Sequence, residues 1–318
     1  MRFPSGGAVG LDRLDRLVHA PSSRALAGSV RELAGLLMPS LCVLCGRQDG
    51  TVCAECAPGL VTELLHPFRA EDDAAALPLY PAGAAQTPPW PPSAGSSGGG
   101  LLTADSSGDG DPPMPPGGPA PPLRPVPVVA AARYGADASR ALLAFKDHGR
   151  TAVAGYLRPA VHRALAAAPR LLGIPGPFTL VPVPASAAGF RGRGYDPVEE
   201  LLTGTLPPGW QVATGWLAHR RKPLLAAIRS RSSHAGAGSR QRRHRGRDRF
   251  RTTRHFAAGD RRDSGRGVVV FDDVMTTGAT LAATWHALEQ AGVRPVGAVV
   301  VAAVTAPGKA PDEGLNSA

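Results

Sequence analysis

The stretch VVVFDDVMTTGATL, from Val268 to Leu281, decides the fold expected for this chain. Its first residues form a short, wholly apolar run, which is typical of a strand buried on both faces of a sheet. Two adjacent carboxylates, Asp272 and Asp273, follow where this strand is expected to end, and small hydroxyl residues and Gly278 then lead into a helical pattern. The order of strand, turn and helix predicts an α/β protein.

The same alternation extends through the C-terminal half of the chain. Strand patterns are expected at residues 125–134, 178–186, 266–273 and 296–305, and helical patterns at 139–169, 196–206 and 278–292, the first as one or two helices. Alternating strands and helices predict a parallel sheet covered by helices on both faces.

Composition divides the chain into five parts. The 39 glycines and 33 prolines mean that much of it cannot pack regularly, and residues 70–124 combine many turn formers with few large apolar side chains. We therefore expect a disordered tail at 1–27, a helix and cysteine module at 28–69, a disordered linker at 70–124, the main α/β domain at 125–306 and a disordered tail at 307–318. The proline-rich pieces of the linker could instead be a ligand for a recognition domain.

Four cysteines lie close together in the sequence as two C-x2-C pairs separated by seven residues: Cys42, Cys45, Cys53 and Cys56. Each pair aims two thiolates at one point, and four thiolates complete the tetrahedral coordination of zinc without an open position. This pattern predicts a structural zinc site. Redox-active disulfides are the alternative.

The carboxylate pair and the turn that follows it have a combined chemical meaning. In an open α/β sheet, ligands bind beyond the carboxyl ends of the strands, where Asp272 and Asp273 are expected. Two carboxylates suit two neighbouring sugar hydroxyls, and a glycine-containing turn at a helix N-terminus suits a phosphate. The stretch therefore predicts a ribose 5-phosphate site, whereas an ordinary strand, an aspartate N-cap and a helix start are the plainer interpretation.

The stretch also resembles the phosphoribosyl pyrophosphate binding motif of type I phosphoribosyltransferases. That resemblance implies that Asp272 and Asp273 are the catalytic residues that orient the ribose hydroxyls, with magnesium accompanying the substrate. It further implies that the 5-phosphate is bound by the residues of the turn, Thr276, Thr277, Gly278, Ala279 and Thr280. The strand LVPVPAS resembles that of the amidophosphoribosyltransferase branch, so Pro184, Ala185 and Ser186 would form the loop that receives the diphosphate.

The order of the parts is similar to that of the ComF family over roughly residues 28–66 and 127–304. The segments that carry this likeness are the cysteine knuckle, AFKDHGR with Lys146, and VPVPASAAGFRGRGYDP with Arg193. Lys146 and Arg193 are accordingly expected to bind substrate. The resemblance implies a type I phosphoribosyltransferase-like parallel sheet with helices on both faces, preceded by a small four-cysteine zinc module.

The chain departs from the ComF pattern at several polar positions. Asp196 and Pro197 stand where family members usually have Asn and Gln, and His234 and Arg245 replace a Gln and an Asn. These changes leave two hypotheses: an enzyme that transfers ribosyl phosphate to an unknown acceptor, or a non-catalytic protein of DNA uptake.

Charge is concentrated in one segment. Residues 217–266 hold 16 Lys and Arg against three acids, although the whole chain has a formal net charge of only +10. This segment has three interpretations: solvated charge, a surface for single-stranded DNA, or neutralisation of substrate phosphates. For the DNA interpretation, only Phe250 and Phe256 within the segment could stack on bases.

Two further expectations concern the cellular context. No stretch reaches the roughly 18 continuous apolar residues of a membrane span, and the charged N-terminus does not resemble a signal peptide. We therefore expect a cytoplasmic protein, with DNA-uptake proteins as partners under the second hypothesis.

Overall fold

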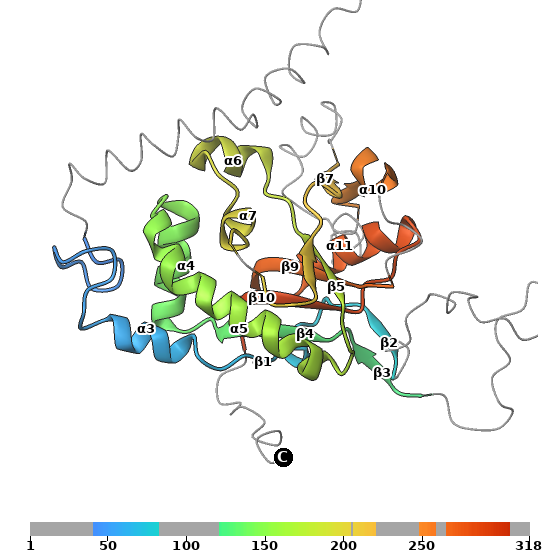
Figure 1. The fold of residues 1–318 in the computed structure, drawn as a ribbon, viewed down its shortest axis with the longest axis horizontal. Coiled ribbons are helices and arrows are strands. Elements are labelled where there is room, and N and C mark those ends of the chain that lie inside the picture. Colours follow the sequence, from blue (N-terminus) through green and yellow to red (C-terminus); the bar gives the residue numbers. More distant parts are fainter. Residues whose placement is uncertain (1–40, 83–120, 205, 221–247, 259–264, 306–318) are drawn as a thin grey trace, which may run out of the picture.

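A computed structural model describes residues 41–82, 121–204, 206–220, 248–258 and 265–305. Its centre is a six-stranded sheet (Figure 1). The strand order is β1 (Phe68–Arg69), β4 (Val128–Arg133), β10 (Gly297–Ala303), β9 (Gly267–Met275), β5 (Phe178–Pro182) and β6 (Trp210–Val212). Only β1 runs antiparallel to its neighbour, so the sheet is mainly parallel, as the sequence predicts.

Helices cover both faces of this sheet, which confirms the predicted fold class (Figure 1). Successive residues of the central strands face opposite ways: Val269 and Phe271 of β9 join one core, whereas Val268 and Val270 join the other. The first core also contains buried residues of α4 (Ala136–Asp147), α5 (Ala154–Leu172) and α7 (Pro197–Leu201). The second contains those of α11 (Ala279–Gln290).

The long helical pattern at 139–169 forms two α-helices. Helix α4 ends at Asp147, and the short 3-10 helix η2 (Thr151–Val153) leads into α5. Gly149 lies between them with a φ of +66°, a left-handed conformation that favours glycine and ends the first helix.

Several short elements complete the fold. The helices α6 (Ala187–Arg193) and α10 (Arg254–Ala258) have seven and five residues. Two small antiparallel sheets pair β2 (Leu79–Pro81) with β3 (Leu123–Pro125), and β7 (Leu217–His219) with β8 (Phe250–Thr252).

The linker boundaries predicted at residues 70 and 124 are wrong. The 3-10 helix η1 (Glu71–Asp73) and the β2–β3 pair lie inside that range, and Ala74 and Leu77 are buried in the second core. These pieces span only three residues each, so no local periodicity reveals them. Three other predictions lie outside the described residues. They are the part of the linker at 83–120, the helix expected at the start of the 28–69 module, and the tails at 1–27 and 307–318.

The cysteine segment packs on the α/β domain and shares its core. Leu44 and Val52 belong to the same buried cluster as α4 and α5. Helix α3 (Ala57–Glu63) follows the cysteines, and its Glu63 accepts hydrogen bonds from the backbone N–H groups of Asp137 and Ala138 in the first turn of α4. The cysteine segment therefore supports α4 directly.

Candidate functional site

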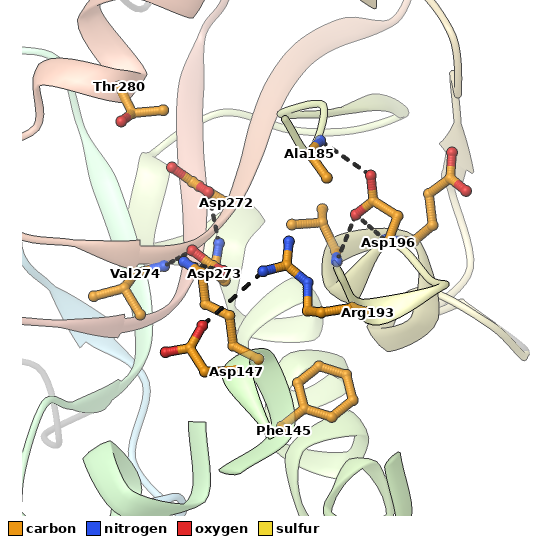
Figure 2. Close-up of polar contacts among 12 residues, drawn as sticks. Phe145, Asp147, Ala185, Arg193, Asp196, Asp272, Asp273, Val274 and Thr280 are labelled. Carbon is orange, nitrogen blue, oxygen red and sulfur yellow. Dashed lines mark hydrogen bonds and ion pairs between the residues drawn. The ribbon is translucent and has the colours of Figure 1, made fainter. Parts of the chain in front are cut away.

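Asp272 and Asp273 lie near the carboxyl end of β9, between β10 and β5. The strand continues to Met275, beyond the end expected from the sequence, so both aspartates have extended backbone and only 7% and 8% exposure. Asp272 Oδ1 accepts a hydrogen bond from the Asp273 N–H at 2.8 Å, and Asp273 Oδ1 accepts one from the Val274 N–H at 2.8 Å (Figure 2). These bonds fix both carboxylates at the edge of the sheet.

Lys146 supplies the positive charge beside this pair. It lies in the last turn of α4, and its Nζ is 2.6 Å from Asp273 Oδ2. Burial, followed by the charge of Asp273, raises the pKa of Asp272 well above its usual value, although the Asp273 N–H and Lys146 act in the opposite direction. The site therefore holds two acidic groups and one counter-charge before any ligand arrives.

The turn from Thr276 to Thr280 connects β9 to α11 and is open to solvent on one side. Thr276, Thr277 and Ala279 are exposed, and Thr280 is half-buried. Gly278 is the N-cap of α11 with a φ of +79°, which a residue with a side chain rarely adopts. The exposed turn at the start of a 12-residue helix presents backbone N–H groups that suit an anion.

The other side of this turn rests on the segment that follows η1. The Ala76 N–H donates to the Thr277 carbonyl at 2.9 Å, and a Cβ on Gly278 would lie only 2.7 Å from the Leu77 side chain. Gly278 is thus required for the backbone conformation and for contact with Leu77.

The predicted diphosphate loop, Pro184–Ser186, follows β5 and lies beside the aspartate pair. The Val183 N–H donates to the Phe271 carbonyl at 2.8 Å, so the loop begins next to the residue that precedes Asp272. Ser186 Oγ accepts from the Gly189 N–H at 3.1 Å and thereby caps α6. A ring nitrogen of His219 lies 3.0 Å from the Pro184 carbonyl, and burial lowers the pKa of this histidine, which favours its neutral form.

Arg193 extends from the end of α6 towards the aspartate pair (Figure 2). Its side chain is 15% exposed, and its Nη1 lies 4.0 Å from Asp147 Oδ1. Its buried Nε has no hydrogen-bond partner among the described residues. A Cβ on Gly189 would lie 2.6 Å from Arg193 Nη2, so this glycine makes room for the guanidinium. Arg193 therefore carries unused hydrogen-bonding capacity beside the site.

The structure also contains site residues that the sequence interpretation missed. Asp196 Oδ2 accepts from the Ala185 N–H at 3.1 Å, and Arg249 Nη1 donates to Thr280 Oγ1 at 3.4 Å. The sequence does place Asp196 at the start of the helix expected at 196–206, where an aspartate before a proline is a recognisable N-cap, but it does not reveal the bond to Ala185. No local signal indicates that Arg249 or His219 lies at the site.

The four cysteines converge as predicted. Their sulfur atoms all lie within 4.8 Å of one another, all four are free thiols, and the Cys53 N–H donates to Cys42 Sγ at 3.4 Å. Burial raises the pKa of Cys42, but hydrogen bonds from the backbone N–H groups of Cys53, Cys45 and Leu44 outweigh it and bring the pKa to about 6. The cluster could hold a metal ion, which is consistent with structural zinc.

Comparison with known families agrees with this geometry. The model of the phosphoribosyl transferase domain family matches residues 236–316. This range contains the aspartate pair, the turn at 276–280 and α11, but neither Lys146 nor the loop at 184–186. The match supports phosphoribosyltransferase-like function in general. No curated protein matches the chain.

Among the described residues, every helix is too short or too polar to cross a bilayer.

Proposed function

We propose that the chain binds phosphoribosyl pyrophosphate and transfers its ribosyl phosphate group to an acceptor. The observation that carries this proposal is the meeting of a buried carboxylate pair with an open helix-start turn at the carboxyl ends of parallel strands. In α/β sheets this edge is where ligands bind. The family match over the same residues supports the proposal.

Each part of the substrate has a suitable set of groups. Asp272 and Asp273 would accept hydrogen bonds from the ribose hydroxyls, while the turn at Thr276–Thr280 would bind the 5-phosphate. The diphosphate would lie against Pro184–Ser186, between Lys146 and Arg193. Lys146 is 37% exposed, and Arg193 Nε has no hydrogen-bond partner within the part of the chain that the structure describes, so both side chains could take an anionic oxygen.

The chemistry requires charge stabilisation more than proton transfer. As the bond between C1 of the ribose and the diphosphate breaks, positive charge develops on the sugar and negative charge on the leaving group. The aspartates lie where they would stabilise the first, and Lys146 and Arg193 where they would stabilise the second. Asp272 and Asp273 are therefore proposed to orient the sugar and stabilise its charge.

Magnesium fits this site as a companion of the substrate. Among the described residues, the cysteines form the only group of three or more possible metal ligands, and they suit zinc rather than magnesium. Mg²⁺ commonly binds through one or two carboxylates together with substrate phosphates, which Asp272 and Asp273 could supply with a diphosphate. When bound, it would neutralise charge on the leaving diphosphate.

We also propose that the chain is related to the ComF family. This proposal rests on the order of four parts in the sequence: the cysteine knuckle, the AFKDHGR segment, the expected diphosphate loop and the carboxylate motif. The DNA-uptake hypothesis depends on the basic segment, of which residues 221–247 and 259–264 lie outside the described residues. No observation on the described residues favours DNA as a ligand over phosphoribosyl pyrophosphate.

Calorimetric titration with phosphoribosyl pyrophosphate and Mg²⁺ tests the proposed function. We expect the double variant Asp272→Asn, Asp273→Asn to lose binding. The control variant Asp49→Asn, Asp137→Asn removes two carboxylates elsewhere and should bind like the wild type. Absence of binding by folded wild-type protein would refute the proposal. Release of diphosphate in the presence of candidate acceptors would then separate an enzyme from a binding protein.

A further inference from the structure

The carboxylate of Asp196 joins the diphosphate loop to helix α7. Its Oδ2 accepts a hydrogen bond from the Ala185 N–H at 3.1 Å (Figure 2). Its Oδ1 accepts from the Val198 N–H at 2.9 Å and from the Glu199 N–H at 3.4 Å, which makes Asp196 the N-cap of α7. One carboxylate oxygen of Asp196 therefore bonds to the loop, and the other bonds to the first turn of α7.

The backbone around Asp196 is anchored, so this carboxylate has a defined position. The buried hydroxyl of Tyr195 donates a hydrogen bond to the carbonyl of Phe145, and Pro197 and Val198 are buried in the next helix. Phe145 precedes Lys146, so the same anchor ties Asp196 to the helix that carries the counter-charge of the aspartate pair.

We propose that Asp196 is a positioning residue whose carboxylate competes with diphosphate for the Ala185 N–H. This inference rests on the proposed function, in which Pro184–Ser186 receive the diphosphate. A diphosphate oxygen bound to the loop would accept a hydrogen bond from the Ala185 N–H. In the structure without ligand, this N–H already donates to the Asp196 carboxylate. The contact therefore holds the loop in shape without ligand, and it lowers affinity for ligands that carry a diphosphate.

An asparagine at position 196 separates these two effects. Asparagine has a single carbonyl oxygen and is a strong N-cap, so this oxygen can keep the bond to the Val198 N–H. The amide NH2 group would then face the Ala185 N–H, and two donors cannot bond to each other. Asp196→Asn therefore retains the cap, releases the loop donor and removes one negative charge.

Inorganic diphosphate with Mg²⁺ is the probe for this proposal, because it reports on the diphosphate part of the site without the sugar. One like charge removed at about 4 Å from a polyanion in a half-exposed site changes affinity by about tenfold. We expect Asp196→Asn to bind inorganic diphosphate about tenfold more tightly than the wild type in calorimetric titration. Ribose 5-phosphate, which lacks the diphosphate, should bind both proteins equally.

Glu199→Gln is the matched control. It removes one negative charge from the same first turn of α7 and leaves the bond between Asp196 and the Ala185 N–H in place. We expect its diphosphate affinity to stay within about twofold of the wild type, because the Ala185 N–H remains bonded to Asp196 in this variant. Thermal unfolding of each variant, and hydrogen exchange at the Ala185 amide, would show that the cap is intact and that the loop donor is released.

The outcomes are distinct. If the wild type binds diphosphate and Asp196→Asn binds equally or more weakly, the competition is refuted and the proposed function stands. An equal gain for Glu199→Gln, or for ribose 5-phosphate, would also overturn it, because general charge would then explain the effect. If neither wild type nor Asp196→Asn binds diphosphate or ribose 5-phosphate while folded, both proposals fail.

Discussion

Replacing Lys146 with methionine tests the electrostatic balance of the aspartate pair. The substitution keeps the length of the side chain and removes the charge that lies 2.6 Å from Asp273 Oδ2. Removing one partner of a buried ion pair costs about 3–5 kcal/mol, whereas an exposed pair contributes about 0.2–1 kcal/mol. Asp273 is buried, but the Lys146 side chain is 37% exposed, so solvent screens the pair in part. We expect the free energy of unfolding to fall by about 2 kcal/mol at pH 8.

The loss should depend on pH in a defined direction. The charge of Lys146 lowers the pKa of Asp272, which burial and the charge of Asp273 hold well above its usual value. Lys146→Met therefore raises this pKa further. A carboxyl group whose pKa is higher in the folded state than in the unfolded state favours folding while it is protonated. This contribution to stability is lost as the pH rises through the folded pKa. The destabilisation by Lys146→Met should accordingly be smaller at pH 5 than at pH 8.

Urea denaturation of four proteins measures this effect: wild type, Lys146→Met, Asp273→Asn and the double variant. Because the two residues are in contact, the double variant should be less destabilised than the sum of the single variants by about 1 kcal/mol or more. Lys146→Arg, which keeps the charge, is the control. Equal destabilisation at pH 5 and pH 8, together with no coupling between the two positions, would refute this reasoning.

Three further predictions concern stability and metal content. Gly278→Ala should lower the free energy of unfolding by about 2 kcal/mol, because φ is +79° and the new Cβ would meet Leu77 at 2.7 Å; an unchanged urea midpoint would contradict this. Cys53→Ser should abolish stoichiometric zinc, measured by mass spectrometry of the purified protein, and lower the melting temperature, whereas Asp49→Asn should change neither; full zinc content in the serine variant would argue against a four-thiolate site. Replacing residues 84–119 by a short turn should leave the melting temperature within about 3 °C of the wild type, because the Ala82 N–H donates to the Pro122 carbonyl at 2.9 Å and already brings the two ends together; a large loss would show that this segment supports the fold.

The parts of the fold that were predictable from the sequence are those with long, uniform patterns. Strands β4, β9 and β10 each contain a run of consecutive apolar residues, and α5 has 19 residues with a clear apolar face. The edge strands β1 and β6 have two and three residues and are defined by their partners. A pattern of period two cannot be recognised over so few residues, so the order of strands at both edges was out of reach.

The same distinction applies to the site. The aspartate pair and the turn at 276–280 are contiguous, so their chemistry could be inferred from one stretch. The charge partner of Asp273 lies on α4, far away in the chain, and Gly278 is supported by Leu77, which falls within the linker expected from the sequence. Contacts between residues far apart in the chain depend on packing, which composition and spacing do not encode locally.

Helix α4 connects the region of the four cysteines to the aspartate pair. Its first turn is held at Ala138 by Glu63 of α3, and its last turn carries Lys146, about 12 Å away along the axis. A fragment cut between these regions would lose the brace at one end of the helix and expose the apolar surface beneath it. The cysteine segment therefore supports the helix beside the proposed sugar site, and we expect that separating the four cysteines from the α/β domain would destabilise both parts.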